Sequence, residues 1–176
     1  MVTGRTDVKR IAMLGLLLAV AMLLSYVEVL IPLPIPIPGV KLGLANLAIV
    51  MVLYFCGCGY AFLVSITRII FTGFLFGNLS MVLYSLAGGV LSLICMSLMM
   101  YKGKGHRETF SIKSISLIGG VAHNMGQIMV AYLVVQTYGV FYYVPFLVLS
   151  GAVTGFVIGF IFELVCPTLR KIITDR

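Results

Sequence analysis

Long runs of apolar residues, separated by short polar or proline-rich segments, make up most of the chain. Between residues 11 and 101 the only charged side chains are Glu28, Lys41 and Arg68, and between residues 114 and 169 the only one is Glu163. A helix that crosses a bilayer needs roughly 20 mainly apolar residues. With Gly, Pro, Asn and charged clusters as boundaries, the pattern predicts six spans, at residues 8–31, 42–56, 60–76, 79–101, 112–138 and 141–166.

Composition agrees with this pattern. Of the 176 residues 61% are apolar, with 12 Lys or Arg and 5 Asp or Glu. In soluble domains about a quarter of the residues are charged, which is far more than here. Disordered chains have low hydrophobicity, which this chain does not. We therefore predict an all-α integral membrane protein, a single six-helix bundle over residues 1–176 with no room for a soluble catalytic domain. The first span is long enough to be a permanent helix rather than a cleaved leader.

Three clusters of cations indicate the orientation of the bundle. Short loops that are rich in Lys and Arg stay in the cytoplasm, and an even number of spans places all three clusters on one face. Both termini are therefore expected in the cytoplasm of a bacterial cell, with the protein in the plasma membrane. The clusters contain Arg5, Lys9, Arg10, Lys102, Lys104, Arg107, Lys113, Arg170, Lys171 and Arg176.

Polar residues inside the spans are the candidates for a binding site, because ionisable groups are costly in lipid and usually face the bundle interior. Arg68 should lie near mid-membrane, where it offers a cation to an anionic ligand, pairs with Glu28, or snorkels to an interface. In the fifth span, Ser116, Gly120, His123, Gln127 and Ala131 form a stripe at helical spacing. His123, Asn124 and Gln127 could contact a ligand there or join helices by hydrogen bonds.

A second polar group is expected at the outer face. Residues 32–38 carry a proline at every second position, which excludes a helix. The chain then reaches Lys41 and Asn46 at the start of the second span, where free backbone N–H groups favour a phosphate or carboxylate. Asn78 lies in the turn between the third and fourth spans. The alternatives are a solvated Lys41 and a helix cap or interhelical contact for Asn46.

Small residues four apart suggest close helix packing. Gly151, Gly155 and Gly159 form such a run in the sixth span, and Gly15 and Ala19 form one in the first. Internal packing explains either run, while a partner subunit is an alternative for Gly15 and Ala19.

Other chemistry is not indicated. The four cysteines are expected as reduced, buried thiols, and the Cys56–Cys58 spacing is too short for a zinc site. The two histidines are far apart, no P-loop is present, and basic residues do not alternate with aromatic ones as in nucleic-acid binding. We predict no metal, no cofactor and no nucleic-acid partner.

Two motifs carry a resemblance to a known family. They are PGVKLGLAN at residues 38–46 and GVAHNMGQ at residues 120–127. With them the chain resembles the bacterial Gx transporter family, whose members are often labelled heptaprenyl diphosphate synthase component I. That family is similar to the S components of energy-coupling-factor transporters. The resemblance implies a first external loop that covers a pocket, and a small-residue motif, here Gly15 and Ala19, that docks a membrane scaffold with ATPases.

The function expected from the sequence is the substrate-binding membrane component of a small-molecule uptake transporter, for an anionic or amphipathic solute. The alternative is a non-catalytic membrane subunit linked to isoprenoid quinone (heptaprenyl diphosphate) synthesis or to flavin and quinone electron transfer. An enzyme is not expected, because prenyl diphosphate elongation needs magnesium held by clustered aspartates. The only aspartates are Asp7 and Asp175, at opposite ends of the chain.

Overall fold

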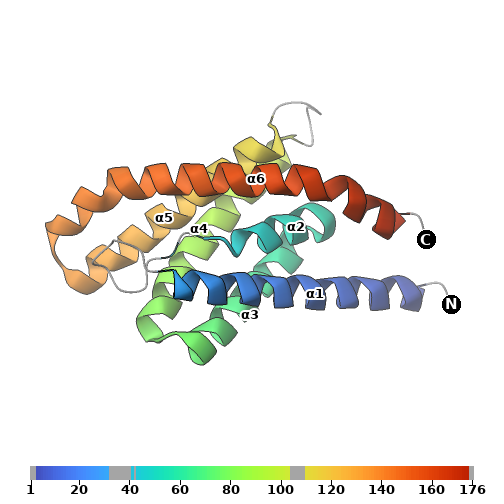
Figure 1. Ribbon diagram of the computed structural model, residues 1–176, viewed down its shortest axis with the longest axis horizontal. Coiled ribbons are helices and arrows are strands. Elements are labelled where there is room, and N and C mark those ends of the chain that lie inside the picture. The colour runs from blue at the N-terminus through green and yellow to red at the C-terminus, as the bar shows by residue number, and fades with distance from the viewer. Residues whose placement is uncertain (1–2, 32–40, 42, 104–109, 175–176) are drawn as a thin grey trace.

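Helices form nearly all of the protein. The computed structural model describes residues 3–31, 41, 43–103 and 110–174, and in these ranges it contains no strand. The α-helices are α1 (Thr3–Leu30), α2 (Asn46–Cys56), α3 (Cys58–Phe76), α4 (Leu79–Gly103), α5 (Ile112–Val135) and α6 (Val144–Thr174), and a 3-10 helix, η1 (Tyr138–Tyr143), joins the last two (Figure 1). The all-α architecture predicted from the sequence is confirmed.

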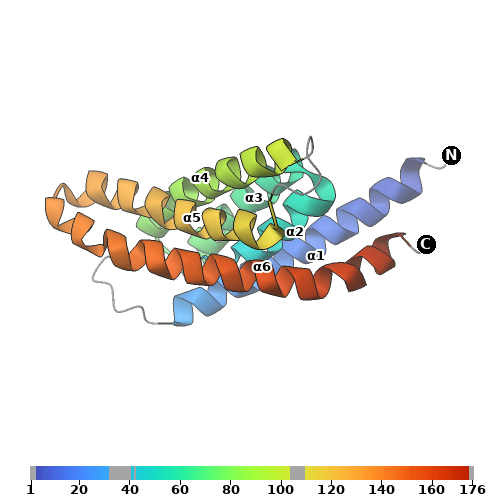
Figure 2. The same ribbon diagram turned by 90° about the horizontal axis from the view of Figure 1, so that it is seen from above.

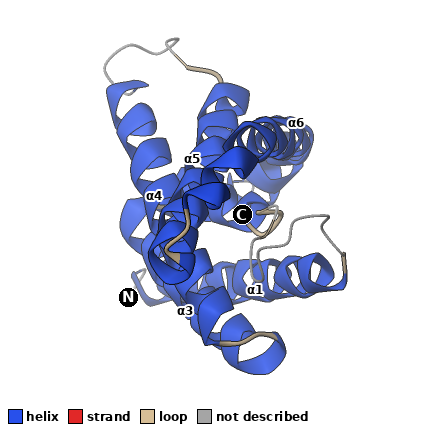
Figure 3. Ribbon diagram, turned by 90° about the vertical axis from the view of Figure 1, so that its left-hand side faces the viewer, coloured by secondary structure: helices blue, strands red, loops and turns tan. Residues whose placement is uncertain are grey.

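The helices form one closed bundle with α2 in its interior, where six consecutive residues of α2, 48–53, are buried. Along the chain, α3 packs against α4, α4 against α5, and α5 against α6. The first helix, α1, packs against α2 and α3, and α2 also contacts α6, which closes the bundle. Figure 2 shows α4, α5 and α6 side by side, and Figure 3, seen along the bundle, shows α1 and α3 on the opposite side from α6. The N-terminal end of α1 and the C-terminal end of α6 lie at the same end of the bundle (Figure 1).

Among the residues that the structure describes, five helices rather than the expected six are long and apolar enough to cross a membrane. The exception is α2, with 11 residues, or about 16 Å at 1.5 Å per residue. The expected second span was 42–56, but the helix begins only at Asn46, because Gly43 has a φ of +88° and residues 44 and 45 form a turn. The bundle therefore has one half-length helix whose N-terminus lies inside the protein.

The other boundaries move by a few residues. The third helix begins at Cys58 rather than residue 60, and α5 ends at Val135, where Gln136 adopts a left-handed conformation. The sixth helix begins at Val144 instead of residue 141 and runs beyond the expected end at residue 166, through Pro167 to Thr174. A proline removes only one helical hydrogen bond, and α6 retains its other backbone bonds on both sides of it.

The glycines of α6 serve internal packing. A Cβ added at Gly155 would lie 2.5 Å from the Ser116 carbonyl oxygen, and one at Gly151 would lie 2.7 Å from the Gly120 carbonyl oxygen. These distances are shorter than any van der Waals contact, so only glycine lets the backbones of α5 and α6 approach this closely. Of the two explanations for this run of glycines, internal packing is the one that the structure supports.

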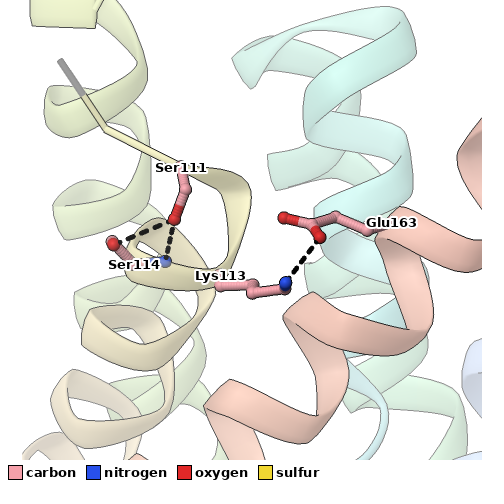
Figure 4. A network of polar contacts seen from close by, with 4 residues as sticks. All are labelled: Ser111, Lys113, Ser114 and Glu163. Atoms are coloured by element: carbon pink, nitrogen blue, oxygen red, sulfur yellow. Dashed lines mark hydrogen bonds and ion pairs between the residues drawn. The ribbon is translucent and has the colours of Figure 1, made fainter. Parts of the chain in front are cut away.

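An ion pair also joins α5 to α6, near the start of α5. Lys113 Nζ lies 2.8 Å from Glu163 Oε2, and both side chains are partly exposed. Two residues before Lys113, Ser111 caps α5 by accepting a hydrogen bond from the Ser114 amide (Figure 4). Partly exposed pairs of this kind contribute at most about 1 kcal/mol to stability, so close packing along the glycines dominates the contact between α5 and α6.

Candidate functional site

A polar cluster occupies the centre of the ring of helices. Its members come from four helices and from the segment before α2, and they are Ser25, Glu28, Lys41, Asn46, Arg68, His123 and Gln127, all buried. The structure thus brings together five of the seven residues that the sequence suggested for ligand binding. We refer to these seven side chains as the polar cluster.

Arg68 is placed by α3, halfway between the two ends of that helix. Its Nη1 donates a hydrogen bond to Ser25 Oγ on α1 at 2.9 Å. Its Nε and Nη2 have no hydrogen-bond partner, although the residue is only 3% exposed. Unpartnered buried cationic groups are costly. The Nε–Nη2 edge of the guanidinium is therefore a pair of unused donors that an anionic ligand would satisfy.

Glu28 lies one helical turn after Ser25 on the same face of α1. Its Oε1 accepts hydrogen bonds from the backbone amides of Gly43 and Leu44, the latter at 2.6 Å. The predicted anion site at the start of the second span therefore holds an anion from the protein itself. The expected Glu28–Arg68 pair is replaced by two separate anchors, although the two charges remain close enough to interact electrostatically.

Lys41 and Gln127 join the segment before α2 to α5. The Lys41 amide donates to Gln127 Oε1 at 3.0 Å. The Lys41 side chain is buried rather than solvated. Burial lowers the pKa of its ammonium group, and the opposing attraction of Glu28 raises it by less.

His123 lies one turn before Gln127 on α5, with its Nε2 2.7 Å from Gln127 Nε2. Because Gln127 Oε1 already accepts from Lys41, its Nε2 must be the donor, and His123 Nε2 must be the acceptor. This arrangement makes His123 a neutral imidazole with its proton on Nδ1. Gly88 of α4 lies against the same ring, since a Cβ there would be 2.9 Å from His123 Nδ1.

Asn46 forms the edge of the polar cluster at the first turn of α2. A Cβ added to Gly43 would lie 3.1 Å from Asn46 Nδ2 and 3.2 Å from His123 Cδ2. Gly43 is therefore packed closely against both of these side chains. Asn46 Nδ2 has no hydrogen-bond partner. Asn46 Nδ2, the free edge of Arg68 and His123 Nδ1 are therefore the buried nitrogens of the polar cluster that have no hydrogen-bond partner.

Two expected ligand residues lie elsewhere. Asn124 is buried but turns toward α6, where its Nδ2 donates to the Leu147 carbonyl at 2.7 Å and to Ser150 Oγ at 3.2 Å. Asn78 is exposed, and its Oδ1 caps α4 by accepting from the Met81 amide at 2.9 Å. The geometry therefore gives Asn124 a helix-packing contact and Asn78 a capping contact.

Sequence reasoning missed Ser25 and treated Glu28 only as a partner for Arg68. A signal was present, because Leu17, Ala21, Ser25 and Glu28 follow helical spacing and form the buried face of α1. Gly15 and Ala19, by contrast, lie on the exposed face of α1, and a Cβ at Gly15 would meet nothing within 4 Å. This pair has no part in the internal packing of the bundle.

Metal chemistry has little basis in the described part of the chain. In the residues described above, no group of three or more His, Cys, Asp or Glu side chains is placed to hold a metal ion. The four cysteines are free thiols. The polar cluster offers cationic and amide donors instead, which suit an anionic ligand.

The fold and the polar cluster define a class, a multi-pass helical membrane protein with a buried polar centre. A family model described as heptaprenyl diphosphate synthase component I matches residues 17–165. The match covers most of the chain, so the chain belongs to this family. The family name refers to one component of a synthase, which is compatible with a chain that is not itself catalytic. No curated protein and no solved structure matches the chain.

Proposed function

We propose that the protein is the substrate-binding component of an uptake system in the bacterial plasma membrane, and that it takes up an anionic small molecule. The observation that carries the proposal is the free edge of Arg68. A guanidinium binds both oxygens of an oxyanion when two of its nitrogens are available on one side. Here Nε and Nη2 are available, and Ser25 holds the third nitrogen.

The rest of the polar cluster supports this role. Lys41 contributes a second cation, and Asn46 adds an unused amide donor. The backbone amides of Lys41, Gly43 and Leu44 donate to side chains of two helices, Gln127 of α5 and Glu28 of α1. A ligand that competes for any of these contacts would displace Lys41, Gly43 or Leu44, so ligand binding and the position of these three residues would be coupled.

Release of the ligand into the cell requires a source of energy that the polar cluster does not provide. A membrane scaffold with ATPases is the partner implied by the resemblance to S components. Gly15 and Ala19 support such a contact, because they lie on the outside of α1 with open space around Gly15. Small exposed residues let a second helix approach closely within lipid.

The first test is mass spectrometry of the small molecules and proteins that co-purify with the full chain in mild detergent. The proposal predicts one bound anionic compound in near-stoichiometric amount, together with a scaffold protein. Recovery of the protein free of any anionic compound, after growth in rich medium and rapid purification, would count against it.

The family name favours a second candidate, a non-catalytic membrane subunit linked to isoprenoid quinone synthesis or to flavin and quinone electron transfer. In that role the His123–Gln127 pair would contact a quinone or flavin head group. A deletion strain separates the two functions. An altered quinone profile with normal solute uptake supports the second candidate, whereas normal quinones with impaired uptake support the first.

A further inference from the structure

The charges of the polar cluster define how much negative charge a ligand should bring. Four ionisable side chains take part, Glu28, Lys41, Arg68 and His123, and each of the last three interacts electrostatically with at least one of the others. Residues 32–40, between α1 and Lys41, contain no ionisable side chain. The charge count of this region is therefore fixed by these four residues.

The hydrogen bonds set the charge state of His123. Its Nε2 accepts from Gln127 while Nδ1 carries the proton, so the ring is neutral. Two cations and one carboxylate remain, which leaves one positive charge without a counter-charge. Charges in a low-dielectric interior are stable only when they are paired, so one negative charge from a ligand would make the polar cluster neutral.

The shape of the free donors gives the second constraint. Nε and Nη2 lie along one edge of the planar guanidinium, and both are unpartnered. This edge fits two oxygens of a planar carboxylate side by side. A diphosphate would also find donors here, but it would bring two or more excess negative charges into the bundle.

We infer that the ligand is a carboxylate monoanion, held by the Nε–Nη2 edge of Arg68, and not a phosphate ester or diphosphate. This inference rests on the proposed function and narrows its substrate class. Lys41 and Glu28 then act as a balanced pair beside the ligand. Glu28 selects against dianions, because its carboxylate already neutralises one of the two cations.

The test compares how strongly small anions of different charge and shape stabilise the protein. Thermal unfolding of the full chain in detergent is followed at pH 8 and constant ionic strength with acetate, inorganic phosphate or pyrophosphate, and with acetamide as the neutral control. Acetate is expected to stabilise the wild type more than either phosphate does. Acetamide should have no effect, and R68Q should remove the response to acetate.

A variant that removes the charge of Glu28 tests whether the net charge of the polar cluster determines which anion binds. The E28Q variant keeps the Oε1 acceptor for the Gly43 and Leu44 amides but raises the net charge by one. The ratio of phosphate to acetate affinity should then rise on the order of tenfold, because the second charge of a dianion no longer meets the Coulomb repulsion of the Glu28 carboxylate. Glu163→Gln, which breaks an ion pair near the start of α5, serves as the matched control and should leave the ratio unchanged.

The possible outcomes separate the inference from the proposed function. Stabilisation by acetate that needs Arg68, with the shift in E28Q, supports the inference. An Arg68-dependent response that is stronger for pyrophosphate or phosphate in the wild type overturns it and leaves an anion-binding function standing. If neither anion acts through Arg68, both the inference and the proposed anion-binding site are wrong.

Discussion

Arg68 on α3 is held by Ser25 on α1, through a 2.9 Å hydrogen bond between Nη1 and the serine hydroxyl. The two residues are 43 positions apart in the chain and come from helices that pack against each other. One turn further along α3, the Thr72 hydroxyl donates a hydrogen bond to the Arg68 carbonyl at 2.8 Å. The contact to Ser25 therefore fixes the direction in which the free edge of the guanidinium points.

Replacing Ser25 with alanine should weaken ligand binding without changing which ligand binds. A hydrogen bond to a charged group is worth about 1.5–3 kcal/mol, and its loss leaves the guanidinium free to turn. We expect the dissociation constant of the co-purified ligand to rise on the order of tenfold, as measured by isothermal titration. The control is Ser80→Ala on α4, which should bind normally. Equal affinity of S25A and the wild type would contradict an orienting role.

Glu28 should matter for the stability of the fold as well as for the charge of the ligand. In Glu28→Ala the amides of Gly43 and Leu44 lose their acceptor. An unsatisfied buried group costs about 1–3 kcal/mol, so this variant should unfold at a clearly lower temperature than the wild type. E28Q retains an oxygen acceptor and should lose less. Identical melting temperatures for E28A and the wild type would show that the start of α2 does not depend on this carboxylate.

Two amide side chains three residues apart on α5 should behave differently. Gln127 bonds to the Lys41 amide and to His123, whereas Asn124 bonds to α6. Gln127→Leu should therefore lower ligand affinity, because the segment before α2 loses its contact with α5. Asn124→Leu should lower thermal stability by about 0.6–2 kcal/mol and leave affinity close to that of the wild type. Reversed effects in a combined binding and unfolding experiment would place the ligand on the α6 side of α5.

Replacing a glycine with leucine should have opposite effects on α1, at Gly15, and on α6, at Gly155. Gly15→Leu adds a side chain where there is open space, so folding and ligand binding should be unchanged while co-purification of a scaffold is lost. Gly155→Leu places its side chain against the backbone of α5 and should prevent correct folding. The measurements are gel filtration in detergent and mass spectrometry of associated proteins. Retention of the scaffold by both G15L and Ala19→Leu would exclude this face of α1 as the contact.

The spacing of polar residues predicted the buried face of α5 correctly. Ser116, Gly120, His123, Gln127 and Ala131 are all buried, because an isolated polar stripe on an apolar helix has no stable place in lipid and must turn inward. The same reasoning grouped Asn124 with Gln127. The sequence could not separate these two, since a buried amide faces whichever neighbouring helix offers an acceptor, and that depends on how α6 packs.

The start of α2 shows what local patterns leave undetermined. The motif at residues 38–46 indicated backbone amides before a helix that attract an anion, and the amides of Gly43 and Leu44 do bind a carboxylate. It did not indicate that α2 begins late or that Glu28 would occupy those amides. That contact depends on how the end of α1 packs against the chain 15 residues later, and the intervening residues 32–40 carry no charge that would indicate this geometry.

The occupancy of the Arg68 site is the most direct test of the central claim, that a buried guanidinium edge holds an anionic ligand. The wild type, Arg68→Gln and Arg170→Gln, an exposed cation at the end of α6, are purified in parallel in mild detergent, and bound small molecules are quantified by mass spectrometry. The account predicts the same anionic compound on the wild type and R170Q, and a loss of at least about tenfold in R68Q. A folded R68Q that carries as much of that compound as the wild type would contradict it.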